Sequence, residues 1–244
     1  ALSPQIGLAY SLNSISFFGG YSSAYETPTL SELSATADGK GGFNNDLNIQ
    51  QARQIELGIR YQKSKLQGSL VWYTIATQND ILPYESASFP SQTLYQNIGE
   101  TQRTGIEWEA NYQPSSSLSI QANYNNASNT FRNGEFKNNE LPGIAKDFGL
   151  LSISKRISKK MNISYKKMYR GVILVSNDNS MSIPKMSVDH LDLVWSVRKV
   201  TLTGGIQNLF DKTYSDNIRI NAFGGRYYET ALPRQLFLRF QTTF

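Results

Sequence analysis

Apolar and polar residues alternate one by one along most of this 244-residue chain. Segment 55–62 places Ile, Leu, Ile and Tyr on one face of an extended strand and Glu, Gly, Arg and Gln on the other, and segments 106–113, 118–125 and 190–197 repeat this pattern. A side-chain period of two is typical of β-strands, whereas a helix requires a period of about 3.6. The alternation therefore predicts an all-β protein with little or no helix.

About eleven strands are expected from the alternating segments. Their ranges are 3–12, 15–25, 51–62, 66–82, 96–113, 118–130, 143–156, 161–175, 186–197, 200–209 and 234–244. Several reach about ten residues or more, whereas strands in globular sheets are usually about 5–6 residues long. The connections alternate between short turns and long loops, and the long loops are expected at 26–50, 83–95, 131–142, 176–185 and 210–233.

This sorting of loop lengths distinguishes two kinds of all-β fold. Outer-membrane barrels have short turns at one end and long loops at the other, whereas a soluble β-sandwich has no reason to sort its loops. The Glu, Gln, Asn, Arg and Ser residues on the second face suit a wet lumen. We therefore favour an antiparallel up-and-down transmembrane β-barrel over the sandwich, and expect Trp108, Trp195 and Phe240 to face lipid.

An odd number of strands has a consequence for such a barrel. Bacterial single-chain barrels have an even number of strands, so both termini lie on the periplasmic side. Here the first and last strands run in the same direction, which places Ala1 at the long-loop end. The two edges of the sheet would need another segment to pair with. We expect residues 1–244 to be the second part of a larger barrel.

The composition narrows the chemistry that this chain can perform. It has no cysteine and one histidine, His190, which excludes disulfides, thiolate metal sites and cysteine nucleophiles. We expect no enzyme activity, no metal site and no cofactor. For His190, a hydrogen-bonded lumen position beside Asp192 is favoured over a metal-binding or proton-relay role. No run of the roughly 18–20 apolar residues of a membrane helix occurs.

The formal net charge of +5 invites a nucleic-acid interpretation, but its distribution argues against one. No aromatic stacking platform accompanies the basic residues, as a single-strand binder would need. Eight of them gather at the short turns, where they are expected to face phospholipid headgroups or solvent: Lys63, Lys65, Lys155, Arg156, Lys159, Lys160, Arg198 and Lys199.

Several segments carry a resemblance to a known family. They are YSSAYETPTLSEL (21–33), NNDLNIQQARQIELGIRY (44–61), GETQRTGIEWE (99–109), and the closing pair GGIQNLFDKTYSDN (204–217) and GGRYYETALPRQLFLRFQTTF (224–244). In this order and spacing they resemble the C-terminal half of the TonB-dependent outer-membrane receptors. The residues that match the family's motifs are Pro28, Leu30, Glu32, Glu56, Gly58, Gly105, Glu107, Asn208, Phe210, Asp211, Tyr214 and Phe244.

The resemblance implies a receptor of about 22 strands with an N-terminal plug, in the outer membrane of a Gram-negative bacterium. It implies that TonB with ExbB and ExbD powers import, that outer-membrane lipid surrounds the wall, and that barrel-assembly machinery recognises the last strand with Phe244. For Asn208 and Asp211 we expect a structural role, in which their side chains cap the passage from strand to loop.

The implied function is active import of a scarce ligand, most plausibly a ferric-siderophore-type iron chelate. Ligand contacts are expected in the long loops and upper lumen, where aromatic rings suit flat chelators and arginines pair with anionic groups. The candidates there are Tyr25, Tyr84, Phe89, Tyr95, Arg132, Arg219, Arg226, Tyr227 and Tyr228, of which two or three are expected to touch ligand. Segment 38–42 is interpreted as a loop tip.

Other functions remain open at this point. The cargo of the same family could be cobalamin, copper or an oligosaccharide. From a different class, the chain could be a passive porin, or an outer-membrane barrel enzyme in which a serine faces His190. A soluble β-sandwich binding module is the third alternative.

Overall fold

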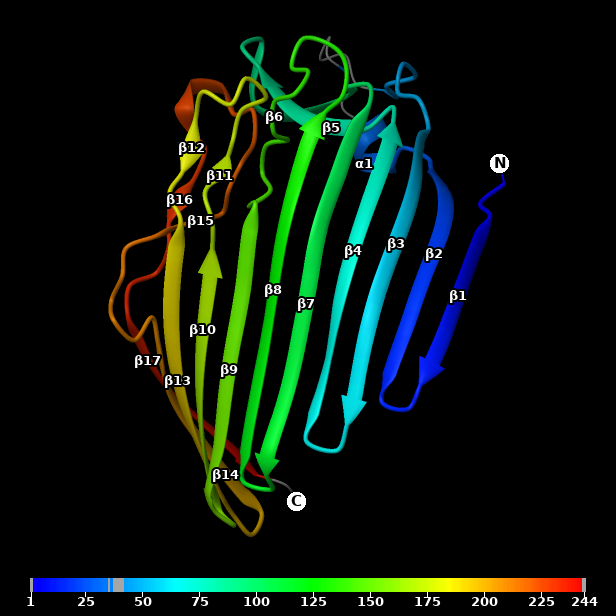
Figure 1. Ribbon diagram of the computed structural model, residues 1–244. Coiled ribbons are helices and arrows are strands. Elements are labelled where there is room, and N and C mark those ends of the chain that lie inside the picture. Colours follow the sequence, from blue (N-terminus) through cyan, green and yellow to red (C-terminus); the bar gives the residue numbers. More distant parts are fainter. Residues whose placement is uncertain (1, 35, 37–41, 243–244) are drawn as a thin grey trace.

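The computed structural model describes residues 2–34, 36 and 42–242. Within them, eleven strands form one antiparallel sheet, in which each strand pairs with the next along the chain and β1 and β17 are the two edges. The sheet curls into a trough (Figure 1). Its strands are β1 (Gln5–Leu12), β2 (Ile15–Glu26), β3 (Gln50–Lys63), β4 (Leu66–Gln78), β7 (Thr101–Ser115), β8 (Leu118–Phe131), β9 (Asp147–Ser158), β10 (Met161–Arg170), β13 (Met186–Val197), β14 (Val200–Gln207) and β17 (Gln235–Thr242).

Short turns join the strands at one end of the trough and long connections join them at the other, as Figure 1 shows at its bottom and top. The long connections contain small elements of their own. These are α1 (Leu30–Leu33), β5 (Ile81–Ser86), β6 (Phe89–Asn97), β11 (Ile173–Leu174), β12 (Ser182–Ile183), β15 (Ser215–Asp216), η1 (Phe223–Gly225) and β16 (Glu229–Thr230). The expectation of an all-β chain with little helix is confirmed. Among the described residues, no helix is long and apolar enough to cross a membrane.

The strand register gives the sheet one apolar and one polar face. A row of paired residues crosses six strands on the apolar face and contains Tyr10, Phe17, Ile59, Leu70, Trp108 and Tyr124. A second row joins Trp195, Leu202 and Phe240 on β13, β14 and β17. Trp108, Trp195 and Phe240 keep 39%, 41% and 64% of their surface exposed, so they do not share a dry protein interior.

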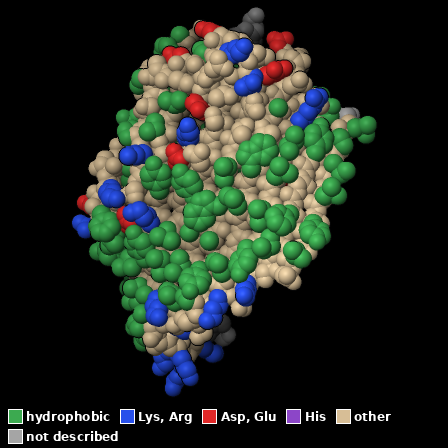
Figure 2. Space-filling model, in the orientation of Figure 1, with side chains coloured by type: hydrophobic (Ala, Val, Ile, Leu, Met, Phe, Trp, Pro, Cys, Tyr) green, Lys and Arg blue, Asp and Glu red, His purple; other side chains and the backbone are tan. Residues whose placement is uncertain are grey.

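Large apolar side chains gather in a band on the side of the trough that Figure 2 shows, and lysines and arginines lie beneath the band. The buried apolar residues lie elsewhere, in the long connections and the adjoining strand ends. They are Ile81, Leu94, Ala127, Phe131, Leu141, Ile173, Val175, Ile183, Val188 and Ala222. No second layer covers the apolar face within the described residues, and the sandwich alternative is therefore wrong.

Four expected strand ends were wrong. β4 ends at Gln78 rather than 82, and β7 begins at Thr101 rather than 96. The chain turns at Asn79 and Gly99, whose φ angles are 55° and 90°, so the intervening segment, expected to be loop at 83–95, forms the hairpin β5–β6. β9 begins at Asp147 rather than 143, and β10 ends at Arg170 rather than 175 because Ile173–Leu174 pairs with β12.

Candidate functional site

Five long connections meet at one end of the trough and form its mouth (Figure 1). We name them in chain order L1 (27–49), L2 (79–100), L3 (132–146), L4 (171–185) and L5 (208–234). Each follows directly from the strands that it joins, so the sheet fixes where each connection starts and ends.

L2 is anchored by a buried ion pair at the root of the β5–β6 hairpin. The Asp80 carboxylate accepts hydrogen bonds from the Thr101 hydroxyl at 2.6 Å and from Nη2 of Arg103 at 2.7 Å. Nη1 of Arg103 donates to Oγ1 of Thr77 and of Thr101. Asp80 and Thr101 are almost completely buried, so these bonds satisfy groups that water cannot reach. The hairpin therefore leaves the wall at a fixed position.

Asn221 joins L5 to two other connections. Its side-chain amide donates to the Pro83 carbonyl in L2 at 3.2 Å and to Oδ1 of Asn177 in L4 at 3.0 Å, and its own Oδ1 accepts from the Asn177 N–H. Its backbone N–H donates to the Val175 carbonyl, and its carbonyl accepts from the Glu85 N–H. Asn221 has a φ of 50°, in the left-handed region that asparagine tolerates better than most residues. One residue thus holds three connections together.

Asparagine side chains also join the remaining connections. In L3 and L4, Asn179 bonds through its side chain to both the N–H and the carbonyl of Glu140. In L1 and L2, Asn97 accepts from the Asn48 N–H at 2.8 Å and donates to the Asn48 carbonyl at 3.1 Å. An asparagine amide both donates and accepts hydrogen bonds, so one side chain can bond to the N–H and the carbonyl of a residue in another loop, as a neighbouring strand would. The five connections form one hydrogen-bonded canopy.

Among the described residues, two clefts open within the canopy. The first has a volume of about 740 Å³, lies between L1 and L2, and is lined by Thr36, Phe43, Asn44, Asn45, Asp46, Leu47, Asn48, Tyr84, Tyr95, Gln96 and Asn97. The second has a volume of about 640 Å³, lies between L2, L3 and L5, and is lined by Leu82, Pro83, Tyr84, Glu85, Thr93, Pro142, Gly143, Ile144, Ile218, Arg219 and Ile220. Tyr84 on the β5–β6 hairpin lines both.

Three of the predicted ligand contacts lie in these clefts. Tyr84 and Tyr95 line the first cleft, and Arg219 lines the second with Tyr84. The predictions did not include the amides of Asn44, Asn48 and Asn97. The only signal in the sequence for these amides is the abundance of asparagine in the long connections.

The other predicted contacts lie away from both clefts. Tyr25 accepts a hydrogen bond from the Gln51 side chain beside the end of β2. Tyr227 packs on the apolar cluster of Ile173, Val175 and Ile183. Arg132, Arg226 and Tyr228 are exposed and line neither cleft. The side chain of Phe89 and most of segment 38–42 lie outside the described part of the chain.

The first family motif forms a helix cap in L1. The Thr29 hydroxyl accepts from the Glu32 N–H, and the Glu32 carboxylate accepts from the Thr29 N–H at 2.7 Å. This reciprocal pair is a capping box, which satisfies N–H groups that the first helical turn leaves without partners. Pro28 precedes the cap and Leu30 begins α1, so this motif builds a short helix.

The motif glycines on β3 and β7 make room for aromatic rings. The tip of the Phe18 ring lies over Gly58, and the Tyr73 hydroxyl lies over Gly105, where a Cβ would come within 2.8 Å of it. The glutamates beside them bond along the same polar face, Glu56 to Gln54 and Glu107 to Asn125.

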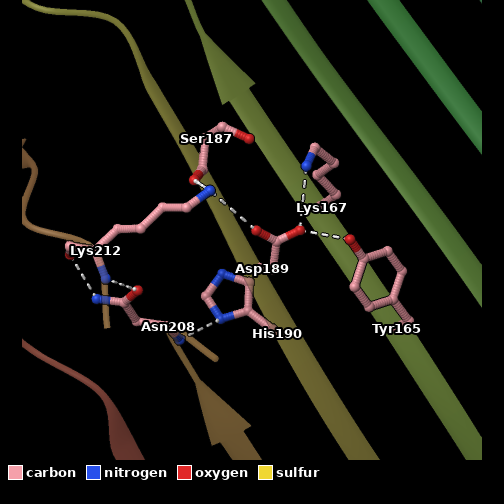
Figure 3. Close-up of polar contacts among 7 residues, drawn as sticks. All are labelled: Tyr165, Lys167, Ser187, Asp189, His190, Asn208 and Lys212. Atoms are coloured by element: carbon pink, nitrogen blue, oxygen red, sulfur yellow. Dashed lines mark hydrogen bonds and ion pairs between the residues drawn. The ribbon is translucent and has the colours of Figure 1, made fainter. Parts of the chain in front are cut away.

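The closing motif folds the start of L5 back onto β13, as Figure 3 shows. Asn208, with a φ of 51°, donates to the Lys212 carbonyl at 2.8 Å and accepts from the Lys212 N–H at 2.9 Å. Nζ of Lys212 then donates to the Ser187 carbonyl at 2.8 Å and lies 3.5 Å from Asp189. The buried Asp189 carboxylate also accepts from Tyr165 and Lys167.

The rest of the closing motif lies near this turn. Asp211 accepts from the Arg234 N–H at 2.7 Å, which ties the start of L5 to its last residue, directly before β17. The exposed Phe210 ring lies below the Lys212 ammonium, and the Tyr214 carbonyl accepts from Ala231. Phe244 lies outside the described residues.

His190 shares the polar face with Asp192, and its Nδ1 accepts from the Asn208 N–H at 3.4 Å. No group of three or more His, Cys, Asp or Glu side chains that could hold a metal ion occurs among the residues that the structure describes. In L4, hydrogen bonds from Ser176 and Ser180 hold the pKa of the exposed Asp178 carboxyl below its usual value.

Comparison with known proteins gives a family and several similar structures. Residues 1–209 match the model of the family described as TonB dependent receptor-like, beta-barrel. The copper transporter OprC superposes with a TM-score of 0.80 at 18% sequence identity, over 99% of this chain and 39% of that one. The ferric citrate transporter FecA in its unliganded form superposes with a TM-score of 0.78 at 19% identity, over 99% and 38%.

The ferric yersiniabactin uptake receptor FyuA from Yersinia pestis is a third similar structure. It superposes with a TM-score of 0.76 at 17% identity, over 98% of this chain and 37% of that one. The chain therefore spans less than two fifths of the length of these three structures. At such identities the structural likeness establishes the fold alone.

Proposed function

Because the chain belongs to the family of TonB-dependent receptor-like β-barrels, we propose that residues 1–244 form the C-terminal part of the barrel wall of an active outer-membrane transporter. We infer from the family that the wall lies in the outer membrane of a Gram-negative bacterium, with lipid against the apolar face and a wet lumen against the polar face. TonB with ExbB and ExbD would supply the energy, and barrel-assembly machinery would insert the wall. The protein moves its ligand without making or breaking a bond in it.

We propose a ferric-siderophore-type iron chelate as the cargo. The observation that carries this proposal is the pair of clefts on either side of the β5–β6 hairpin, with Tyr84 in both. Aromatic faces stack on flat organic chelators, and side-chain amides and the Arg219 guanidinium can bond to their oxygen atoms. Volumes of about 740 and 640 Å³ lie in the range of small-molecule sites, roughly 300–1,000 Å³.

Two of the three similar structures support this class of cargo, since their names are those of a ferric citrate transporter and a ferric yersiniabactin receptor. The third is named a copper transporter, which makes copper the second candidate. The two candidates present different surfaces to the mouth. A ferric chelate presents an organic surface that aromatic and amide groups can contact, whereas a copper ion alone presents no organic surface.

The test uses the complete gene of which this chain is a part. A deletion strain is grown in iron-depleted medium supplemented with one ferric chelate at a time, in tonB-positive and tonB-negative backgrounds, with and without the gene on a plasmid. We expect the gene to restore growth and radioactive iron uptake on at least one ferric chelate, only when TonB is present. Restored copper uptake with no iron phenotype would contradict the proposed cargo. Steady conductance of the purified protein in a planar bilayer without TonB would contradict active transport.

A further inference from the structure

The described turns at the short-turn end of the sheet carry side-chain charges of one sign only. The eight cations at the turns, which we name the basic rim, are Lys63, Lys65, Lys155, Arg156, Lys159, Lys160, Arg198 and Lys199. All eight are exposed, and none forms an ion pair within the described residues. No Asp or Glu occurs in segments 11–16, 61–68, 113–119, 154–162 and 196–201. The other 16 Lys and Arg residues are outnumbered by 19 acidic residues, so the positive net charge comes from this rim.

The rim is densest where two turns lie side by side. β10 pairs with β13, so Met161 lies opposite Trp195 and the Ser196 N–H donates to the Lys160 carbonyl at 2.8 Å. The turns at 158–161 and 197–200 are therefore neighbours, and they bring together a cation cluster of Lys159, Lys160, Arg198 and Lys199. Neighbouring like charges repel one another, and an anion that lies against the cluster would relieve this repulsion.

Arg198 adopts a left-handed backbone conformation, which is uncommon for arginine. Its φ is 52°, in the left-handed region that glycine and asparagine adopt more easily. In the turn between β1 and β2, Asn13 has the same conformation with a φ of 53°. An arginine therefore stands where the local backbone favours asparagine, and it adds a fourth positive charge to the cation cluster.

The cation cluster borders the apolar band directly. Trp195 and Ile157, both exposed, lie within a few residues of the two turns, and Phe240 continues the Trp195 row on β17. Figure 2 shows lysine and arginine side chains at the lower tip of the molecule, immediately below the band of apolar side chains. In a bilayer, headgroup phosphates lie at this boundary between apolar and aqueous surface, where tryptophan is enriched.

We propose that the cation cluster is a binding site for anionic phospholipid headgroups of the phosphatidylglycerol type, in the leaflet next to the short turns. This inference rests on the membrane placement given under the proposed function. The phosphodiester of phosphatidylglycerol carries a net negative charge, which Lys and Arg bind at a membrane surface. Phosphatidylethanolamine is zwitterionic and lacks this net charge. A nucleic acid would also present phosphates, but it would leave the adjoining apolar band in water.

The experiment compares two triple variants of the full-length protein, delipidated in detergent. K159Q/K160Q/K199Q removes three charges from the cation cluster, and K137Q/K146Q/K185Q removes three exposed charges from the opposite end. Binding of phosphatidylglycerol and phosphatidylethanolamine is titrated by native mass spectrometry. We expect the unaltered protein to prefer phosphatidylglycerol by about tenfold, the cluster variant to lose at least fivefold in affinity for it, and the control to change less than twofold.

A second variant separates lipid binding from folding. Arg198→Asn places the residue that the left-handed backbone favours and removes one charge, so thermal stability should stay the same or rise while phosphatidylglycerol affinity falls two- to threefold. Equal affinity for both lipids, an equal loss in the control variant, or displacement of phosphatidylglycerol by a 20-nucleotide single strand at 150 mM salt would overturn the proposal. Iron uptake is measured in a separate experiment. If the protein proves not to import a ferric chelate, the lipid titration still tests the phospholipid site.

Discussion

The tip of the Phe18 ring on β2 occupies the space over Gly58 on β3 that a Cβ atom would fill. A Cβ built there would lie 2.7 Å from both Cε atoms of the ring. The Arg60 guanidinium lies over the same ring, 5.4 Å from its centroid. The ring therefore lies along the polar face, held between the backbone of the next strand and a cation, because position 58 has no side chain.

Gly58→Ala should destabilise the barrel. The added methyl must displace Phe18, and overpacking of this kind costs about 1–3 kcal/mol. Urea unfolding of the full-length protein in detergent measures the change in the free energy of unfolding. Gly204→Ala is the control, since a Cβ there meets its nearest atom at 3.8 Å. Equal effects of the two substitutions would contradict the explanation, whereas Phe18→Ala should relieve most of the cost of Gly58→Ala.

Asp80→Ala should loosen the β5–β6 hairpin while the rest of the sheet stays paired. The substitution leaves the Arg103 guanidinium, 24% exposed, without its carboxylate. Breaking a buried pair costs about 3–5 kcal/mol, and partial solvent contact lowers this to roughly 2–3 kcal/mol. Hydrogen exchange of the amides at 81–97 should accelerate by about 30-fold or more. Asp192→Ala is the comparison: it removes a longer ion pair, 3.7 Å, with the half-exposed Lys166 on β10, away from L2, and should change exchange at 81–97 little.

Asn221→Gly should open the canopy. Glycine keeps the left-handed backbone but removes the side-chain bonds to Pro83 and Asn177, so L2, L4 and L5 lose a shared partner. Limited proteolysis of the folded protein should cut these connections faster. Asn217→Gly removes an amide from a residue of similar φ, 46°, in the same connection. If both variants are cut at the same rate, Asn221 is not the residue that joins the connections.

Tyr84→Ala should weaken binding of the ferric chelate identified by the growth experiment by at least tenfold. Tyr84 lines both clefts, whereas Tyr228 lines neither and is 51% exposed. Fluorescence titration of the purified protein gives the dissociation constants. Tyr228→Ala should bind the chelate as tightly as the unaltered protein. If only Tyr228→Ala loses affinity, the chelate binds outside the two clefts and the prediction is wrong.

Acid should loosen L4 through Asp178. Its pKa is lowered in the folded protein, so the stabilisation is present above the unfolded pKa, about 3.9, and is lost as the pH falls through the folded value. Amides at 176–181 should exchange faster, relative to a model peptide, only below about pH 4. Asp178→Asn retains an oxygen that accepts from the Ser180 N–H but does not titrate, so its relative exchange rates should not depend on pH there.

The sequence determined the wall. Strand number and the two faces follow from a period of two, which is a local property: each residue's face is fixed by its neighbours along the chain. Trp108 and Trp195 were assigned to the apolar face on this basis, and both are exposed there. The long connections were recognised as well, because a long stretch without alternation separates two alternating segments.

Only the tertiary structure decided the mouth. Asn221 bonds to Pro83 across 138 positions of the chain, and Asn48 bonds to Asn97 across 49. No periodic signal links such residues, since the curvature of the sheet brings their connections together. The β5–β6 hairpin was hidden for a related reason, because Ile81 and Gln96 were assigned to the long strands expected at 66–82 and 96–113, whereas the chain turns at Asn79 and Gly99. The contacts that shape the clefts are therefore properties of the folded sheet, while its alternating strands are a property of the sequence.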